Sequence, residues 1–525
     1  MYAESAGIMQ AIPRAVAVAA DVDDVRALVR WAACERLPLI PRGSGSSMAG
    51  GAVGDGIVID LSRLSALSPV DNMRRTVWGG AGVLRRRVEQ AANAEGLRFP
   101  VDPSSGAFAT IGGMTATNAA GPHTLAFGAM RRWVEAIDCV FDDGSHATVR
   151  RGAALPRGVP ALDRWSALAE SLRADAMSAG GPAVRKQSSG YGVGDFARSG
   201  ELVDLLVGSE GTLALFMAIE LRLAPMPADT ASLLVSWGSL DDAVAGAALA
   251  RSAGAAACEL LDRTFLDVAR DGGAVPAPND AECVLLVELE SGADAARPAS
   301  AAAAAQALAA GFQSLGAMSV LVGLDAESQE SLWALRHAAS PILARLDPHL
   351  KSMQLVEDGC VPPERLGDYV LGVRSALTAA RFRGVIFGHA GDAHVHVNAL
   401  VDVREMDWRP RVRAFFDRVV QLTASLGGSL AGEHGDGRLR TPSLRHTWTA
   451  ESRALFARLK SCFDPLGILN PGVIVPSEQD VDPLGAIKYD LDLPPLPARA
   501  RMVLDRVERE RAYDVARLEM LDGAG

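Results

Sequence analysis

The chain has 525 residues, too many for a single hydrophobic core, so we expect two or three domains. Its formal net charge of −11 excludes nucleic acid as an expected partner, because neutralising phosphates requires a basic surface. The composition, 49% hydrophobic and 22% charged, is that of a globular protein, and no apolar run reaches the roughly 18 to 20 residues of a membrane span. We expect a cytoplasmic protein with no membrane span, with a peripheral position at the inner membrane as the alternative.

The cysteines exclude two kinds of metal site. Iron–sulfur clusters and thiolate zinc sites require closely spaced thiolates, and the sequence contains no Cys-x-x-Cys pair. Any iron–sulfur relay must therefore lie on another chain, and we expect the cysteines to be buried core residues. They are Cys34, Cys139, Cys258, Cys283, Cys360 and Cys462.

Helix and strand patterns alternate in the first 225 residues. Apolar residues recur at helical spacing over residues 22–34, and Asp21 is a suitable N-cap for that helix. Asp143-Gly144 predicts the turn of a hairpin. A Pro-rich stretch ends this pattern, and we place a domain boundary near residue 226. The strands that we expect cover residues 37–40, 56–60, 137–141, 146–149, 202–207 and 213–223.

The second half predicts a different arrangement. Strand-like runs at residues 231–237, 283–290 and 318–322 are separated by helical stretches, among them the alanine-rich residues 295–310. This alternation favours an α+β domain in which helices cover one sheet. After residue 475 the sequence changes to a Pro-rich connector and a charged helix, 498–521, which indicates a linker or docking element.

Four segments are rich in Gly, Ser, Thr and Asn. The first, residues 41–53, follows an expected strand, and successive backbone N–H groups in such a loop can bind a diphosphate. A single Gly-x-Gly also fits a plain surface loop, and no Gly-x-Gly-x-x-Gly opens a helix here, which disfavours a Rossmann fold. Segments 110–121, 186–192 and 208–213 have the same character. Together they predict a long polar ligand lying across the domain.

Two polar segments of the second half concentrate the histidines. Residues 387–398 and 429–440 hold four of the nine histidines in the chain, which indicates an active site. In a strand, side-chain alternation would place His394, His396 and Asn398 on one face, with valines packed behind them.

These motifs resemble a known family. The N-terminal glycine-rich segments are similar to the PCMH-type FAD-binding domain of the vanillyl-alcohol-oxidase family. Gly-His-Ala-Gly-Asp (388–392), Gly-Glu-His-Gly-Asp-Gly (432–437) and Leu-Asn-Pro-Gly (469–472) resemble its FAD-linked oxidase C-terminal domain. Within that family the chain most resembles the D-2-hydroxyacid dehydrogenases, which act on D-lactate or D-2-hydroxyglutarate or form the flavin subunit of glycolate oxidase.

The resemblance implies an α+β fold. We expect a two-subdomain FAD-binding domain at 1–226 and a substrate or cap domain at 227–440, with an antiparallel sheet covered by helices. Residues 441–476 would return to the FAD domain, and 477–525 would form a Pro-rich connector and a charged helical tail.

The resemblance also implies a reaction, the oxidation of a D-2-hydroxy acid to the 2-oxo acid with hydride passing to flavin N5. Such a reaction requires a base, a cation for the substrate carboxylate and polarisation of the substrate oxygen. His434 matches the family's catalytic base. Arg336 matches its carboxylate-binding arginine, and Asn398 would face the substrate. The positions that bind a divalent metal in relatives, usually zinc, are His389, His396 and Glu433.

The sequence departs from its relatives at three places. Relatives usually read Gly-Asn where this chain has Ala393-His394, so His394 would add a ligand or change the metal's identity. Val356 stands where D-2-hydroxyglutarate-type relatives have a lysine for the distal carboxylate. The first glycine loop has no histidine for covalent attachment, so we expect non-covalent FAD. The residues expected to bind it are Pro41, Arg42, Gly43, Ser44, Gly45, Ser46, Ser47, Gly112, Gly113, Thr117, Asn118, Gly121, Gly211, Thr212 and Asn470.

Other functions remain open from the sequence. One is a flavin alcohol oxidase of the same fold, which the metal cluster and Arg336 disfavour. Another is a non-catalytic flavin-binding subunit of an electron-transfer complex, which the intact histidines disfavour. For a dehydrogenase, the expected partners are a small 2-hydroxy acid and an electron acceptor such as an iron–sulfur protein, a quinone, a cytochrome or an electron-transfer flavoprotein. A homodimer is a further possibility.

Overall fold

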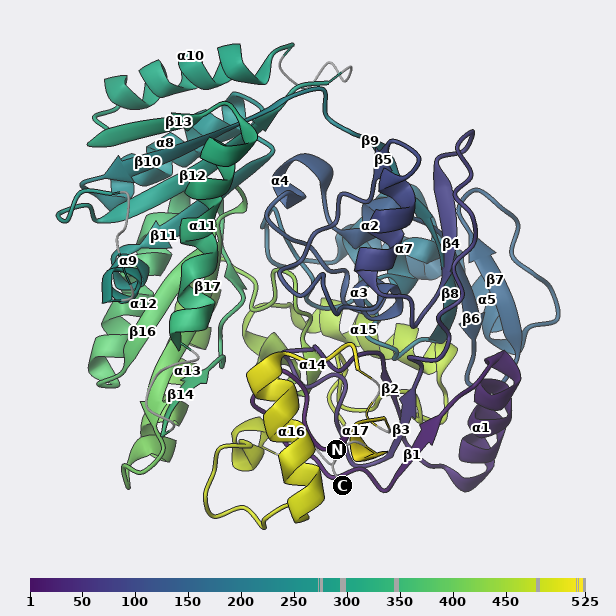
Figure 1. Ribbon diagram of the computed structural model, residues 1–525. Coiled ribbons are helices and arrows are strands. Elements are labelled where there is room, and N and C mark those ends of the chain that lie inside the picture. The colour runs from purple at the N-terminus through teal and green to yellow at the C-terminus, as the bar shows by residue number, and fades with distance from the viewer. Residues whose placement is uncertain are drawn as a thin grey trace.

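The computed structural model describes residues 1–522 except 272, 274–276, 293–298, 344–348, 478–481, 516 and 518. It consists of an N-terminal part, built mainly from residues 1–225, and a central part, residues 226–440, which lie side by side (Figure 1). The chain passes between them from strand β9 (Ala224–Pro225), which pairs with β5 (Leu97–Arg98), to strand β10 (Thr230–Trp237).

The N-terminal part contains two separate sheets. A small parallel sheet has the order β1 (Ala15–Val18), β3 (Ile57–Asp60), β2 (Leu39–Arg42). Helix α1 (Val22–Glu35) covers it through Val25 and Val29, and the carboxylate of Asp21 caps this helix by accepting from Asp24 N. The second sheet is antiparallel, in the order β4 (Thr76–Gly80), β8 (Leu215–Arg222), β6 (Val134–Val140), β7 (His146–Arg150).

Residues 202–207 are helical, so the predicted strand there is wrong. The segment forms α7 (Leu202–Leu206), and all five of its residues are buried. The run is apolar apart from Asp204, and it is too short for its periodicity to separate a buried strand from a buried helix. The other helices of this part are α2 (Arg85–Asn93), α3 (Ile111–Thr117), α4 (Thr124–Phe127), α5 (Pro160–Ser178) and α6 (Val193–Ser199), with a 3-10 helix at Met130–Trp133.

The central part is built on one antiparallel sheet. Its order is β13-β10-β12-β11-β16-β17-β14, and β15 pairs with β17. These strands are β11 (Ala257–Asp262), β12 (Cys283–Glu290), β13 (Ser319–Gly323), β14 (Leu350–Met353), β15 (Gly359–Cys360), β16 (Arg383–His389) and β17 (His394–Asp402). The three strands predicted from the sequence are therefore confirmed as β10, β12 and β13, within one or two residues.

Helices cover both faces of this sheet. On one face α8 (Leu240–Ser252), α10 (Ala301–Ser314), α12 (Leu366–Ala379) and α13 (Trp408–Ser425) form the largest core, and on the other lie α9 (Arg263–Asp271) and α11 (Ala326–Leu343). The alanine-rich helix begins at Ala301, because the Ser300 hydroxyl accepts from Ala303 N as its N-cap. Residues 295–298 of the predicted helix lie outside the described residues. Short 3-10 helices lie at Pro363–Arg365 and Ala390–Asp392.

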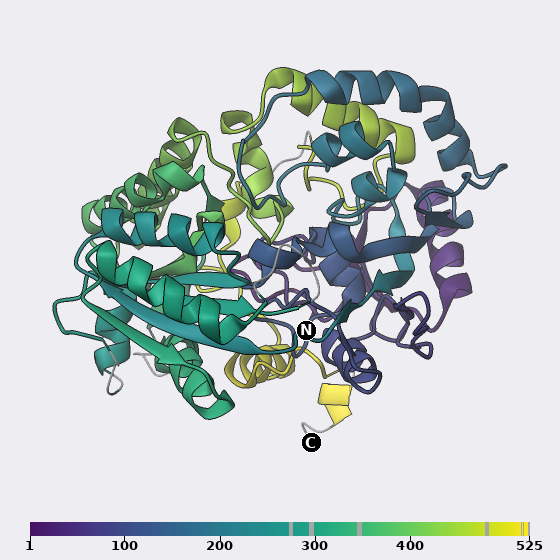
Figure 2. The same ribbon diagram turned by 90° about the horizontal axis from the view of Figure 1, so that it is seen from above.

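The chain then returns to the N-terminal part. After α14 (Gly437–Arg440) and a 3-10 helix (Thr441–His446), α15 (Ala450–Phe463) packs against α5. A further 3-10 helix (Pro483–Ala486) precedes the tail. The single tail helix expected at 498–521 is interrupted. Helix α16 (Ala498–Glu510) ends at Arg511, which has a left-handed backbone, and α17 (Glu519–Asp522) follows. The N-terminus and α17, which holds the last described residues, lie on the same side of the molecule (Figures 1 and 2).

Candidate active site

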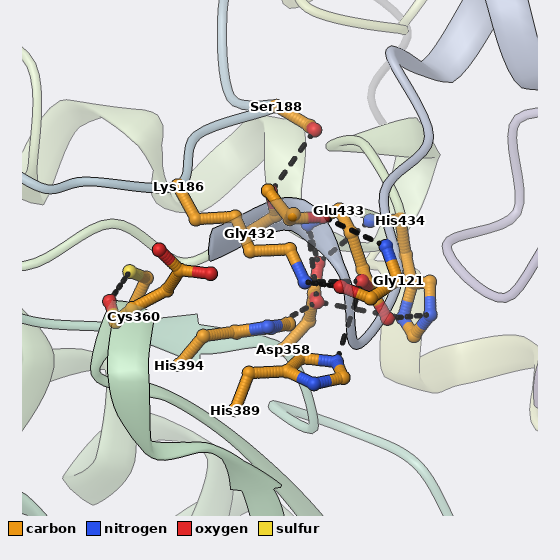
Figure 3. Close-up of polar contacts among 12 residues, drawn as sticks. Gly121, Lys186, Ser188, Asp358, Cys360, His389, His394, Gly432, Glu433 and His434 are labelled. Carbon is orange, nitrogen blue, oxygen red and sulfur yellow. Dashed lines mark hydrogen bonds and ion pairs between the residues drawn. The ribbon is translucent and has the colours of Figure 1, made fainter. Parts of the chain in front are cut away.

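The two histidine segments meet where the central part contacts the N-terminal part. His389 ends β16, and His394 and His396 begin β17, paired with it. The loop that carries Glu433 and His434 approaches them (Figure 3). The two segments predicted to form an active site therefore lie close together. His394 and His396 stand at alternate positions of strand β17, as expected.

Three side chains converge at a spacing that suits one metal ion. His396 Nε2 lies 3.4 Å from His389 Nε2 and 3.3 Å from Glu433 Oε1, and His389 Nε2 lies 3.6 Å from Glu433 Oε2. Ligand atoms held at about 2.0–2.2 Å from a tetrahedral ion are separated by distances of this order. All three side chains are buried. Two imidazoles and a carboxylate therefore fit a divalent metal such as zinc.

Acceptors on the far side of each imidazole orient it. Glu259 Oε1 lies 2.5 Å from His389 Nδ1, and the carbonyl oxygen of Glu357 lies 3.1 Å from His396 Nδ1. Donation from Nδ1 leaves Nε2 of each ring to bind a metal. Although burial raises the pKa of Glu259, the charges of His389 and Arg336 lower it to about 2. Glu259 therefore stays ionised, as this role requires.

Arg336 belongs to the same network. Its Nε donates to Glu259 Oε2 at 2.9 Å, and its guanidinium carbon lies 4.6 Å from the centre of the Phe387 ring. Arg336 is thus separated from His389 by a single carboxylate. Asn398, two residues beyond His396 on β17, is 9% exposed.

His394 has different partners from its neighbours. Its Nε2 lies 2.7 Å from Asp358 Oδ1, and its Nδ1 is buried without a hydrogen-bond partner among the described residues. Burial lowers the pKa of His394 to about 3, so the ring is neutral. It lies close enough to His389, His396 and Glu433 to join them as a fourth ligand.

His434 is the most exposed member of the cluster. Its side chain is 25% exposed, while those of His389, His396 and Glu433 are below 9%. Nδ1 lies 2.8 Å from Glu357 Oε1, and Nε2 lies 3.2 Å from Glu433 Oε1. Burial lowers the pKa of His434, but the surrounding carboxylates outweigh it and raise that pKa well above its usual value.

A buried charge network that the sequence analysis missed supports the site. Arg440 Nη2 donates to Glu357 Oε1 at 2.5 Å, and its Nη1 donates to Asp358 Oδ2 at 3.2 Å. Asp358 also accepts from the backbone N–H of His434 at 2.9 Å. One sequence signal existed, since Glu357-Asp358 interrupts an otherwise apolar stretch, and paired acids in such a stretch need buried cations.

Lys186 was also missed. Its side chain is fully buried, and Nζ donates to Glu433 Oε2 at 2.6 Å. Burial lowers the pKa of Lys186, but Glu433 outweighs it and raises that pKa, so the ammonium stays charged. The segment 186–192 was predicted to bind a ligand because of its small residues. Lys186, its single cation, instead extends from the N-terminal part to Glu433 in the histidine cluster (Figure 3).

The first glycine loop offers donors to a ligand. None of the backbone N–H groups of residues 43–47 donates to an acceptor in the described part of the chain, and the buried Ser47 hydroxyl also lacks a partner there. Gly45 has a φ of 78°, a backbone conformation that glycine adopts at the lowest cost. A run of free N–H groups is the arrangement that binds a diphosphate, so this loop fits FAD.

Other expected flavin-binding residues mainly organise the backbone. Asn470 Nδ2 donates to the carbonyls of Gly51 and Glu210, and its Oδ1 accepts from Arg438, which ties residues 469–472 to the N-terminal part. The Arg42 guanidinium donates to three backbone carbonyls. The remaining expected residues lie in β2, in and just after α3, and in the loops near Gly121 and Gly211. Each of these residues contacts other residues of the N-terminal part. They are Pro41 (beside Gly211), Gly112, Gly113, Thr117, Asn118, Gly121 and Thr212.

Glu210 joins the two parts and gives a pH prediction. Its carboxyl accepts from the backbone N–H groups of Asp436, at 2.7 Å, and Gly437. Burial, then the charge of Asp436, raises its pKa from 4.5 to about 8. The folded state therefore keeps a proton that the unfolded state loses, so stability should fall as the pH rises from about 4.5 to about 8.

We expect Glu210→Gln, which imitates the protonated carboxyl, to flatten this dependence. Between pH 5 and pH 8 the wild type should lose roughly 3 kcal/mol more of its free energy of unfolding than the variant does. Urea unfolding at several pH values measures the difference, with the exposed Glu330→Gln as a matched control. Parallel profiles for wild type and Glu210→Gln would contradict the prediction.

Comparison with known proteins agrees with this geometry. A profile described as "FAD binding domain" matches residues 13–150, and one described as "FAD linked oxidases, C-terminal domain" matches residues 226–474. D-lactate dehydrogenase of Archaeoglobus fulgidus is 30% identical over 457 residues, 86% of this chain and 89% of that protein. Glycolate oxidase subunit GlcD of Bacillus subtilis is 27% identical over 467 residues, 88% of this chain and 89% of that protein.

Two further similarities involve a longer protein and a solved structure. D-2-hydroxyglutarate dehydrogenase of Escherichia coli is 28% identical over 90% of this chain, which spans 49% of that protein. Among solved structures, 4-ethylphenol oxidase from Gulosibacter chungangensis superimposes with a TM-score of 0.62 at 14% identity, covering 88% of this chain and 89% of that one. Among the described helices, none is both long and apolar enough to cross a membrane.

Proposed function

This chain belongs to the FAD-linked oxidases, and from that premise we propose that it is a dehydrogenase that oxidises a D-2-hydroxy acid to the 2-oxo acid. At the coarser level it is an FAD-dependent oxidoreductase of the D-2-hydroxyacid dehydrogenase and glycolate oxidase group. The observation that carries the proposal is the cluster of His389, His396 and Glu433 with His434 beside it, where the two parts of the molecule meet. In this proposal the site lies between two domains, a flavin domain that ends near residue 226 and a substrate domain that ends near residue 440.

His434 acts as the base in this proposal. Glu357 holds its Nδ1, and the proton of the substrate hydroxyl would pass to Nε2, which lies 3.2 Å from Glu433 Oε1. The partial exposure of the ring supports access to substrate. FAD bound to the N-terminal part supplies the acceptor for the hydride that leaves C2.

The remaining residues orient the substrate. A zinc ion or similar divalent metal held by His389, His396 and Glu433 supplies a Lewis acid for the substrate oxygen. Arg336 binds the carboxylate, and Asn398 contacts the substrate from the His396 face of β17. Val356 is buried and apolar where a distal carboxylate would need a cation, which favours a monocarboxylate such as D-lactate or glycolate.

The FAD is held without a covalent bond, because its glycine loop has no histidine to link it. Electrons then leave to an acceptor on another molecule, such as an iron–sulfur protein, a quinone, a cytochrome or an electron-transfer flavoprotein. A flavin alcohol oxidase is the weaker alternative, since a neutral alcohol needs neither the metal-type cluster nor Arg336.

Anaerobic bleaching of the flavin band at about 450 nm tests the proposal. A panel of D- and L-2-hydroxy acids is added to the purified protein, with and without a chelator. We expect one D-acid to bleach the flavin rapidly and the chelator to slow that bleaching. Reduction by a neutral alcohol but by no hydroxy acid would replace the proposal with the alcohol-oxidase alternative.

A further inference from the structure

The C-terminal segment beyond the matched family domains folds back onto the N-terminal part. The C-terminal profile ends at residue 474, while α16 and the residues after it pack against the start of the chain (Figure 1). Val503, Val507, Tyr513 and Met520 form a hydrophobic cluster with Phe108 of the N-terminal part. Two sets of ion pairs add to it, Arg501 with Glu4 and Arg86 with Asp514. The tail is therefore docked, as one of the sequence interpretations allowed.

This docking places a buried cation beside the first glycine loop. Arg517 is 4% exposed, and its Nη2 donates to the carbonyl oxygen of Ser44 at 3.3 Å. Its Nη1 donates to the carbonyls of Ala512 and Val515, which holds the guanidinium on the tail's own backbone. Its Nε is buried and has no hydrogen-bond partner among the described residues. Arg517 thus keeps unused donor capacity at the rim of the loop.

The surroundings of Arg517 carry an excess of positive charge. Burial, then the charge of Arg517, lowers the pKa of Arg42 to about 10, and burial followed by these arginines lowers the pKa of the Met1 amino group. Asp60, which accepts from the Tyr2 hydroxyl at 2.7 Å, offsets part of this charge, and Glu4 and Asp514 pair with other arginines. A buried group of cations with so little counter-charge is costly unless an anion joins it.

We propose that Arg517 binds the diphosphate of FAD together with the free N–H groups of residues 43–47, and that residues 498–515 together with Arg517 form a strap that slows release of the cofactor. Three observations meet at this place, namely the unpaired N–H groups, the unpartnered Arg517 Nε and the excess of buried positive charge. The proposal rests on the FAD binding of the proposed function but not on the identity of the substrate. It assigns a cofactor contact to a segment outside the matched flavin domain.

The test compares Arg517→Met with Arg509→Met, an exposed arginine of α16. The protein is stripped of flavin, and the Kd for FAD and the rate of FAD release are measured by flavin fluorescence. We expect Arg517→Met to weaken FAD binding about 10- to 100-fold, the effect of losing one charge-assisted hydrogen bond, and to speed release. Arg509→Met should match the wild type, and Arg517→Lys should fall between them.

ADP, which carries the diphosphate without the isoalloxazine ring, locates the contact. As a competitor of FAD it should lose affinity for Arg517→Met by a similar factor. Unchanged ADP affinity, or equal FAD affinity in all the variants, would overturn the assignment of Arg517 while leaving the dehydrogenase proposal intact. Failure of the wild type to bind FAD would instead remove the proposed function. Far-UV circular dichroism identifies any variant that does not fold, in which case Arg517→Lys carries the comparison.

Discussion

Replacing His434 by asparagine is expected to slow reduction of the flavin by substrate about 10³-fold, the usual contribution of a general base. Asparagine can still donate to Glu357 but cannot accept the substrate's proton. Because His434 lies in the substrate domain and contacts Glu357 and Glu433, the variant should retain FAD. Anaerobic stopped-flow measurement of flavin absorbance in a single turnover gives the rate constant for this step directly.

The pH dependence of the same rate constant provides a second measurement. The base must be neutral to accept a proton, and the carboxylates around His434 raise its pKa after burial has lowered it. The wild-type rate should therefore rise with pH until His434 has lost its proton, and His434→Asn should lack that rise. His446→Asn, an exposed histidine beside Gln421, is the matched control and should behave as wild type. A rate within a few-fold of wild type, with the same pH profile, would exclude His434 as the base.

The candidate ligands are easier to recognise in the sequence than the residues that contact them. His389 and Glu433 each follow a glycine in a short polar motif, and His396 alternates with valines, so these residues are recognisable from their local sequence. Glu259 is one of two acids in the buried strand β11, and it lies 130 residues from its partner His389. Nothing near it in the sequence marks the pairing, because strand pairing across the sheet brings the two together. Lys186 was also missed, because its partner Glu433 lies 247 residues away in the sequence.

The fold shows a similar division. Predictions that depend on periodicity and caps, such as α1 with Asp21 and strand β12, are confirmed. The predictions are wrong where the local sequence does not distinguish the alternatives, namely at the buried segment α7 and at the break between α16 and α17. In the tail, burial of Val503 and Val507 against Phe108 decides the arrangement. A charged helical pattern gives no information about where such a helix docks.

The second large effect is the loss of bound metal when a proposed ligand is replaced. Two histidines of strand β17 test it. His396→Asn should lower metal affinity at least 100-fold, because it removes one of three ligands, and the protein should purify with little metal. His394→Asn, two residues earlier on β17, should retain the metal, since the Nε2 of His394 is committed to Asp358. Elemental analysis of the purified proteins measures metal content, and flavin reduction by the D-acid should fall in step with it.

The pair of variants separates three arrangements of the site. Loss of metal from both would make His394 a fourth ligand, and its Nδ1, which has no partner in the described part of the chain, would be the atom that binds. Retention in both, with wild-type flavin reduction, would contradict the metal site and leave a hydrogen-bonded cluster. The contacts favour the remaining arrangement, in which only His396→Asn loses the metal. The Glu433 carboxylate lies between the Lys186 ammonium and the Nε2 atoms of His389 and His396. The carboxylate therefore remains charged, and it is oriented towards the position that the ion would take.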